Sequence, residues 1–364
     1  MGFTILIPLL PFVVKRFGAP DAVAGTLITT GALCATIASP FWGRLSDRAG
    51  RKRALLGSQI AAFTGYVLLA VAGNLTLLFV SRIVEGLGGG NLGVASAYIS
   101  DVTTEEERPR ALALATAAFG AGFIVGPVLG GALAHFGFAL PFFFAAGLQA
   151  INFTLTAWLL PESHAPQPRA TVSAKTLRAT LFRHRIGSVM VCRFAYIFAF
   201  TFFFTSFSLF LNDVLGAGPE ASSLLLGVAG VVGATTQIFG VGALVRRFGL
   251  HKVTLAAFAA GILAYGLLGL VNGIAFFVVT IAFWAFSGSI LRPALDARIA
   301  QLVPQNERGT FLGFADSLDN FSLIFAPTLG AAVVGAAPRL VGIIPALALA
   351  LGFGLTTREK SDGA

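Results

Sequence analysis

The chain has 364 residues, of which 56% are hydrophobic and only 11% are charged, and its formal net charge is +9. A soluble globular protein has about 25% charged residues, so the composition excludes a soluble fold with a single core. The basic residues lie in short segments between apolar runs, which fits the Lys and Arg excess of cytoplasmic membrane loops better than nucleic-acid binding. We expect a lipid bilayer as the surroundings and no nucleic-acid partner.

Twelve apolar segments follow one another along the chain. A spanning helix needs about 20 largely apolar residues. The segments are residues 2–14, 22–42, 54–72, 76–99, 110–134, 137–160, 186–211, 221–245, 252–271, 274–295, 308–335 and 340–356. They predict an all-α polytopic membrane protein with twelve transmembrane helices.

The first segment, residues 2–14, is too short to cross a bilayer before the charges of Lys15 and Arg16. A cleaved signal peptide fits poorly, because there the charges precede the apolar run. We expect a truncated first helix, the result of a mis-assigned start or a trimmed terminus.

A strongly charged segment joins the second and third apolar segments. Residues 43–53 hold five basic residues and one acid, Asp47. Positive charge resists translocation, so this segment is expected at the cytoplasmic surface. With both termini cytoplasmic, 20 of the 25 basic residues fall on that side or at its border. We therefore predict a multi-pass inner (plasma) membrane protein with both termini in the cytoplasm.

The fourth segment contains the run Gly-Leu-Gly-Gly-Gly at residues 86–90. No strand precedes this run and it lies inside an apolar segment, so it does not fit a phosphate-binding loop. Close packing of helices in the membrane explains it better.

The longest polar stretch, residues 161–185, is predicted to be a cytoplasmic linker. It divides a six-helix bundle at 1–160 from a second at 186–364 that ends in a short cytoplasmic tail. An internal repeat supports this division. At an offset of 200, eight residues of the first half recur in the second: Arg108, Leu112, Ala115, Ile124, Pro127, Leu129, Gly130 and Ala132. Repeats of this kind are typical of transporters whose substrate site lies near the bilayer midplane.

Charged residues within the apolar segments are functional candidates, because each is costly at the bilayer centre. The acids are Glu85, Asp316 and Asp319, and the basic residues are Arg82 and Arg193. Arg82 and Glu85 are three residues apart and share a helix face. They form either a mutually neutralising pair that helps helix packing or a proton site.

Asp316 and Asp319 also share a helix face and are followed by Asn320. Two carboxylates this close do not both ionise easily, so one is expected to hold a proton. The pair suits proton transfer, binding of a cationic substrate, or hydrogen bonds to neighbouring helices. Arg292, beside Pro293, either extends to the membrane interface or binds an anionic substrate.

The seventh segment is rich in phenylalanine, with residues such as Phe202, Phe203 and Phe207. We favour lipid-facing positions for these side chains. An apolar pocket with cation–π capacity is the alternative. The chain shows no nucleophile motif, no metal-ligand cluster and no nucleotide-binding loop, so we expect neither an enzyme nor a metal or other cofactor.

Three motifs resemble the major facilitator superfamily, and in particular its twelve-helix drug–proton antiporters. The charged segment resembles the family's loop between helices 2 and 3, with Gly43, Asp47, Arg48, Gly50 and Arg51 at hallmark positions. Residues 78–86 resemble its fourth-helix motif, with Arg82 and with Glu85 where Gln is more usual. The helix-5 antiporter motif is matched by Gly122, Gly126, Pro127, Gly130 and Gly131.

The resemblance implies the major facilitator fold, two pseudo-symmetric six-helix bundles, and a gate at the loop motif. In this gate Asp47 faces the N-terminal end of the eleventh helix, near Arg308 and Gly309, and Arg51 pairs with Asp101. Gly43 and Gly50 permit close approach and a tight turn. The resemblance also places Arg82 and Glu85 on a cavity wall. The second-half copy of the motif, residues 245–252, has no acid.

We therefore predict a secondary transporter that works by alternating access and exports small hydrophobic or cationic compounds, such as drugs, in exchange for protons. The expected partners are a small-molecule substrate and protons, with the proton gradient as the energy source, and we expect a monomer. One alternative is proton-coupled import or exchange of a metabolite such as a sugar or organic anion. Another is a non-transporting membrane receptor on the same fold.

Overall fold

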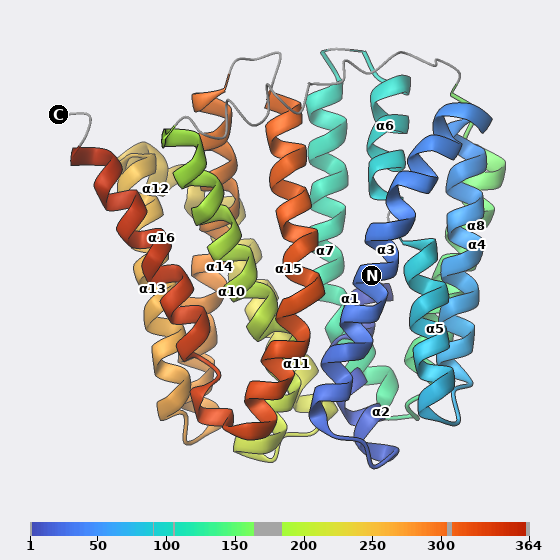
Figure 1. The fold of residues 1–364 in the computed structure, drawn as a ribbon, viewed down its shortest axis with the longest axis horizontal. Helices are drawn as coiled ribbons and strands as arrows, with labels where there is room; N and C mark the ends of the chain where they lie inside the picture. The colour runs from blue at the N-terminus through green and yellow to red at the C-terminus, as the bar shows by residue number, and fades with distance from the viewer. Residues whose placement is uncertain (1, 90, 105, 164–183, 304–307, 362–364) are drawn as a thin grey trace. The chain divides into compact units, whose positions relative to one another are not determined.

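A computed structural model of the chain describes residues 2–89, 91–104, 106–163, 184–303 and 308–361. Over these residues every regular element is a helix (Figure 1). Those of the first half are α1 (Gly2–Leu6), α2 (Leu10–Arg16), α3 (Asp21–Ala49), α4 (Arg51–Ala70), α5 (Leu75–Gly88), α6 (Leu92–Val102), α7 (Arg108–Ala134) and α8 (Leu140–Leu159). Those of the second half are α10 (His184–Leu215), α11 (Pro219–Thr235), the π-helix η1 (Thr236–Gly240), α12 (Val241–Phe248), α13 (Leu250–Leu267), η2 (Leu268–Leu270), α14 (Ile274–Leu302), α15 (Arg308–Ala336), η3 (Pro338–Leu340) and α16 (Ile343–Ser361).

Each predicted apolar segment coincides with one helix or with consecutive helices. Among the described residues, nine helical stretches are long and apolar enough to cross a membrane. The all-helical membrane fold is thus confirmed, whereas the count of twelve spans remains a prediction. Most of the predicted linker, residues 164–183, lies outside the described residues.

Two predicted segments are each divided into two helices. The first breaks between α1 and α2, where Pro8 and Pro11 remove backbone donors. The fourth breaks between α5 and α6, where a run of glycines weakens the helix. The predicted close packing of this run is confirmed, because a Cβ on Gly86 would lie 2.5 Å from the carbonyl oxygen of Gly31 in α3.

The described helices form two compact units. Unit 1 contains α1 to α8 together with residues 218–227 at the start of α11. Unit 2 contains α10, the rest of α11, and α12 to α16. The division at a linker over residues 161–185 stays a prediction.

The packing within the two units follows the internal repeat. In unit 1, α1 packs on α7 and α8, and α4 packs on α5 and α8. The corresponding helices of unit 2 pack in the same pairs, with α10 on α15 and α16, and α13 on α14 and α16. The sequence similarity at an offset of about 200 therefore reflects a repeated three-dimensional arrangement.

The favoured interpretation of the phenylalanines of α10 was wrong. Phe202, Phe203 and Phe207 are each at most 1% exposed, so they are buried in protein and do not face lipid. The reason is that α10 packs against α14, α15 and α16, which leaves it little free surface. An apolar helix buried by other helices has the same composition as one that faces lipid, because both surroundings are apolar.

Replacement of Gly65 by alanine is predicted to destabilise unit 1. A Cβ there would overlap Glu85 of α5, and overpacking of this kind costs about 1–3 kcal/mol. Unfolding of the purified protein in mixed micelles measures the loss. Gly147→Ala is the matched control: it also lies within a helix, and no described atom is within 4 Å of its Cβ position. Equal stability of the two variants would contradict the close α4–α5 contact.

Candidate functional site

The charged segment at residues 43–53, where α3 ends and α4 begins, is held by one buried arginine. Arg51 donates from Nε to Asp101 Oδ2 at 3.0 Å and from Nη1 to Ser46 Oγ at 2.9 Å. Its Nη1 also contacts Asp47 Oδ1 at 2.5 Å. The Arg51–Asp101 contact implied by the family resemblance is therefore present. The predicted contact of Asp47 with the eleventh helix, and the role of Arg48, stay predictions.

The segment after α8 docks on the same charged segment, a contact that the sequence did not predict. Glu162 Oε1 accepts a hydrogen bond from the backbone N–H of Lys52 at 3.0 Å. Its carboxylate thus lies at the N-terminal end of α4, where the helix dipole favours negative charge. A Cβ on Gly50 would lie 2.5 Å from this carboxyl group, and the φ of Gly50 is +103°. The positive φ requires glycine, and the absence of a side chain lets the Glu162 carboxylate come this close. At Gly43 no described atom lies within 4 Å of the Cβ position, so its role stays a prediction.

Arg82 and Glu85 form an ion pair inside unit 1. Arg82 Nη2 contacts Glu85 Oε2, and Tyr66 Oη donates to Oε1 at 3.3 Å. The two charged side chains are only 2% and 13% exposed. A Cβ on Gly31 would lie 2.9 Å from Arg82 Nη2, so glycine leaves room for the guanidinium. This geometry fits mutual neutralisation; a role as a proton site stays a prediction.

Five charged side chains meet in unit 2, and we call them the charge cluster: Arg193 of α10, Arg292 and Asp296 of α14, and Asp316 and Asp319 of α15. Arg193 is fully buried. It binds Asp319 with two hydrogen bonds, from Nε to Oδ1 at 3.1 Å and from Nη2 to Oδ2 at 2.8 Å. Such bidentate pairs are among the stronger polar contacts in proteins.

The remaining contacts of the cluster differ in closeness. Arg193 Nη1 contacts Asp296 Oδ1 directly, whereas its Nη2 lies 3.5 Å from Asp316 Oδ1. Arg292 Nη2 lies 3.4 Å from Asp319 Oδ2 and 3.7 Å from Asp316 Oδ1. Two positive groups face three negative ones, so one negative charge is in excess when all are ionised. A bound proton or cation would neutralise this excess.

Sequence reasoning found only part of this cluster. It singled out Asp316, Asp319, Asn320 and Arg292, and the structure places Asn320 on the exposed side of α15. It noted Arg193 without assigning it a partner, and it missed Asp296 because the tenth segment was ended at residue 295. The spacing of Arg292 and Asp296 could have identified Asp296, because residues four apart share a helix face and can form an ion pair.

A hydrogen-bonded aromatic group joins α10, α13 and α14 within unit 2. Trp284 Nε1 donates to Tyr265 Oη at 3.0 Å, which donates to the carbonyl of Ala199 at 2.8 Å. Phe200 stacks on Trp284 with 5.1 Å between ring centroids. Tyr265 and Trp284 are the repeat equivalents of Tyr66 and Glu85, at an offset of 199. The pair α4–α5 in unit 1 therefore carries an acid at the position where its repeat equivalent in unit 2, the pair α13–α14, carries an indole.

The helix-5 motif brings α7 close to α1. All five of its residues lie in α7: Gly122, Gly126, Pro127, Gly130 and Gly131. Thr4 Oγ1 donates to the carbonyl of Gly122 at 2.8 Å, and a Cβ on Gly130 would lie 3.0 Å from the carbonyl oxygen of Ile5. These glycines let two backbones touch; their role in transport stays a prediction.

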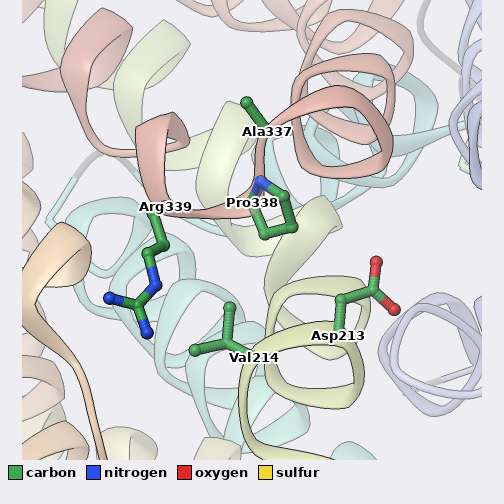
Figure 2. A pocket seen from close by; sticks show the side chains of 5 residues that line it. All are labelled: Asp213, Val214, Ala337, Pro338 and Arg339. Atoms are coloured by element: carbon green, nitrogen blue, oxygen red, sulfur yellow. The ribbon is translucent and has the colours of Figure 1, made fainter.

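A pocket of about 370 Å³ lies at one end of unit 2, with Arg339 and Asp213 on opposite sides of the view in Figure 2. Its lining residues are Asp213, Val214, Ala337, Pro338 and Arg339. Asp213 is 20 residues from Arg193 along α10, about 30 Å at the helical rise per residue. The pocket is thus remote from the charge cluster, and we assign it no function.

Comparison with known proteins gives a consistent result. The sequence model of the Major Facilitator Superfamily matches residues 1–188 and again residues 189–362. The tetracycline resistance protein, class C, of Escherichia coli is 30% identical over 355 residues, which cover 92% of this chain and 87% of that protein. Multidrug resistance protein 2 of Bacillus subtilis (strain 168) is 26% identical over 374 residues, which cover 100% of this chain and 93% of that protein.

Solved structures share the fold. The nucleoside transporter NupG superposes with a TM-score of 0.78 at 15% identity, covering 98% of this chain and 96% of its own. The human organic anion transporter MFSD10 superposes with a TM-score of 0.69 at 20% identity, and the match covers 98% of this chain and 95% of that protein's chain.

Replacement of Asp319 by asparagine is predicted to destabilise unit 2 far more than the same replacement at Asp316. Asp319 is the bidentate partner of a buried guanidinium, and breaking a buried ion pair costs about 3–5 kcal/mol. Asp316 is 65% exposed and its contacts are long, so its loss should cost less than about 1 kcal/mol. Unfolding of both purified variants in mixed micelles tests this. Equal losses would show that Asp319 is not the main anchor of Arg193.

Proposed function

This chain belongs to the Major Facilitator Superfamily, and we propose that it is a proton-coupled exporter of small hydrophobic or cationic compounds that works by alternating access. It is a secondary transporter and not an enzyme. The proposal agrees with its relatives, which are tetracycline and multidrug resistance proteins aligned over nearly the full chain.

The observation that carries the proposal is the charge cluster of unit 2. Ionisable residues within membrane-spanning helices mark ion and substrate pathways, because they are too costly to keep there otherwise. The cluster holds one carboxylate more than it has guanidinium groups. A proton and a cationic substrate can each balance that charge, and their mutual exclusion would couple the two flows.

The protein is a multi-pass inner-membrane protein that moves a small-molecule substrate. Four finer features belong to the proposal. Both termini face the cytoplasm, the chain acts as a monomer, the proton gradient supplies the energy, and no other cofactor takes part. The positive-inside distribution of Lys and Arg supports the orientation.

Organic-anion transport is the main alternative, and it depends on Arg292. The guanidinium of Arg292 lies 3.4 Å from Asp319 and 3.7 Å from Asp316. An anion would have to displace these carboxylates while the cluster already carries excess negative charge. The electrostatics therefore favour a cation.

Purified protein in vesicles with an acidic interior is expected to accumulate a cationic dye such as ethidium from outside. Protons leave through the protein as the dye enters, and an uncoupler should abolish the accumulation. Empty vesicles with the same gradient are the control. Accumulation of a labelled sugar or organic acid in place of the dye, with the gradient reversed, would support the importer alternative and contradict the proposal.

Replacement of Asp47 by asparagine is expected to shift the protein towards its inward-open state, because the proposed gate loses its acid. Cysteine accessibility on the two membrane faces measures the equilibrium. Arg44→Gln is the control, since Arg44 is an exposed residue of the same charged segment, and among the described residues its Nε donates to the carbonyl of Pro40 one turn earlier in α3. An unchanged equilibrium in Asp47→Asn would leave the loop with a topological role alone.

A further inference from the structure

We propose that the junction of α12 and α13 is a binding surface for the phosphate group of an anionic phospholipid. We call it the basic surface, and it consists of Arg246, Arg247, Phe248 and Lys252. It is the unit 2 copy of the charged segment at residues 43–53, and the proposed transport gives it no role. The inference does not depend on which compound the protein transports.

The two copies of the segment share one backbone turn. Gly50 and Gly249 correspond at an offset of 199, and their φ angles are +103° and +81°. The N–H of Gly249 donates to the carbonyl of Val245 at 2.9 Å, as that of Gly50 donates to the carbonyl of Ser46 at 3.2 Å. Because the turn is the same, the side chains at corresponding positions can be compared directly.

The acids around this turn are present in unit 1 and absent at the corresponding positions of unit 2. Three carboxylates contact the unit 1 turn: Asp47, Asp101 and Glu162. Their equivalents at the same offset are Arg246, Ala300 and Ser361. The buried Arg51 corresponds to Leu250. Unit 2 therefore carries an arginine where unit 1 carries Asp47, and it has neither of the other two acids.

The basic side chains of the surface are accessible to a ligand. Arg246, Arg247 and Lys252 are all exposed, and none of them forms an ion pair with an acid among the side chains that the structure describes. The Arg247 guanidinium lies over the ring of Phe248, 5.3 Å from its centroid. An anion can therefore bind here without displacing a carboxylate of the described residues.

The basic surface lies where two membrane-spanning stretches meet. Residues Pro219–Phe248 and Leu250–Leu270 are both long and apolar enough to cross a bilayer, and only Gly249 separates them. The turn therefore lies at the level of the lipid headgroups. Long basic side chains extend to the phosphates from this position, and the 49% exposed ring of Phe248 offers an apolar contact beside them.

The chemistry of the surface selects a lipid with a net negative charge. Guanidinium groups bind phosphate oxygens with paired hydrogen bonds, and a zwitterionic headgroup brings a cation that the arginines repel. At the unit 1 turn a phosphate would meet the carboxylate of Asp47, which is 54% exposed. A signal for membrane orientation requires only basic residues on one side. It does not require the absence of acids, since the unit 1 turn carries them.

The test measures lipid binding to the purified full chain by native mass spectrometry in neutral detergent micelles, titrated with phosphatidylglycerol or with phosphatidylcholine. Wild type is expected to bind its first phosphatidylglycerol more tightly than its first phosphatidylcholine. Arg246→Gln/Arg247→Gln should weaken phosphatidylglycerol binding about tenfold or more, because each basic residue near an anionic lipid strengthens binding about fivefold. Phosphatidylcholine binding should not change. Arg246→Asp, which introduces the acid of the unit 1 copy, should weaken phosphatidylglycerol binding more than Arg246→Gln does.

Arg44→Gln/Arg53→Gln is the matched control, because it removes two exposed arginines of the unit 1 copy and changes the net charge equally. It should change phosphatidylglycerol affinity less than about twofold. Equal losses in the two double variants, or equal losses for both lipids, would overturn the inference. So would displacement of the lipid by inorganic phosphate at the same concentration, which would indicate a site for the free anion. If the unit 2 double variant does not fold, Lys252→Gln decides, and unchanged phosphatidylglycerol binding there would overturn the inference.

Discussion

The cost of placing a charge in an apolar helical bundle governs this structure. A buried ion must be paired, because neither lipid nor apolar side chains replace its hydration. The molecule meets this requirement differently in its two units. In unit 1, Arg82 and Glu85 balance one another within one helix. In unit 2, a single buried guanidinium, that of Arg193, ties together acids from α14 and α15. The charge cluster therefore also holds three helices together.

The fold also requires the backbones of neighbouring helices to approach closely. Glycine permits this approach at positions related by the internal repeat. Gly130 of α7 lets α1 come near, and its equivalent Gly330 in α15 does the same for α10, where a Cβ would lie 2.6 Å from the carbonyl oxygen of Phe202. Packing of helices in a bilayer depends on such small residues, since lipid supplies no hydrophobic drive between helices. The repeat thus conserves the packing contacts, while the functional side chains on the same scaffold have diverged.

The sequence was sufficient for features that depend on local composition. Long apolar runs located the helices, whereas the Arg51–Asp101 contact was implied by the family resemblance of residues 43–53. It was insufficient where partners are far apart in the chain. Arg193 and Asp319 are 126 residues apart, and no spacing rule links them. Glu162 docks on α4 across 110 residues for the same reason. The prediction for the phenylalanines of α10 was wrong for another reason. The sequence of an apolar helix is the same whether protein or lipid covers it, so it does not show which of the two surrounds these side chains.

The two units differ in a way that bears on selectivity. Tyr66 and Glu85 in unit 1 correspond to Tyr265 and Trp284 in unit 2, so the tyrosine is kept while its partner changes from an acid to an indole. Unit 1 keeps its acid beside an arginine and is electrically balanced there. The acids of unit 2 lie on α14 and α15, where they outnumber the guanidinium groups of the charge cluster. A balanced pair has no need of a mobile cation, whereas an unbalanced cluster does. This imbalance is the reason that the proposed exchange of a proton for a cationic substrate is assigned to unit 2.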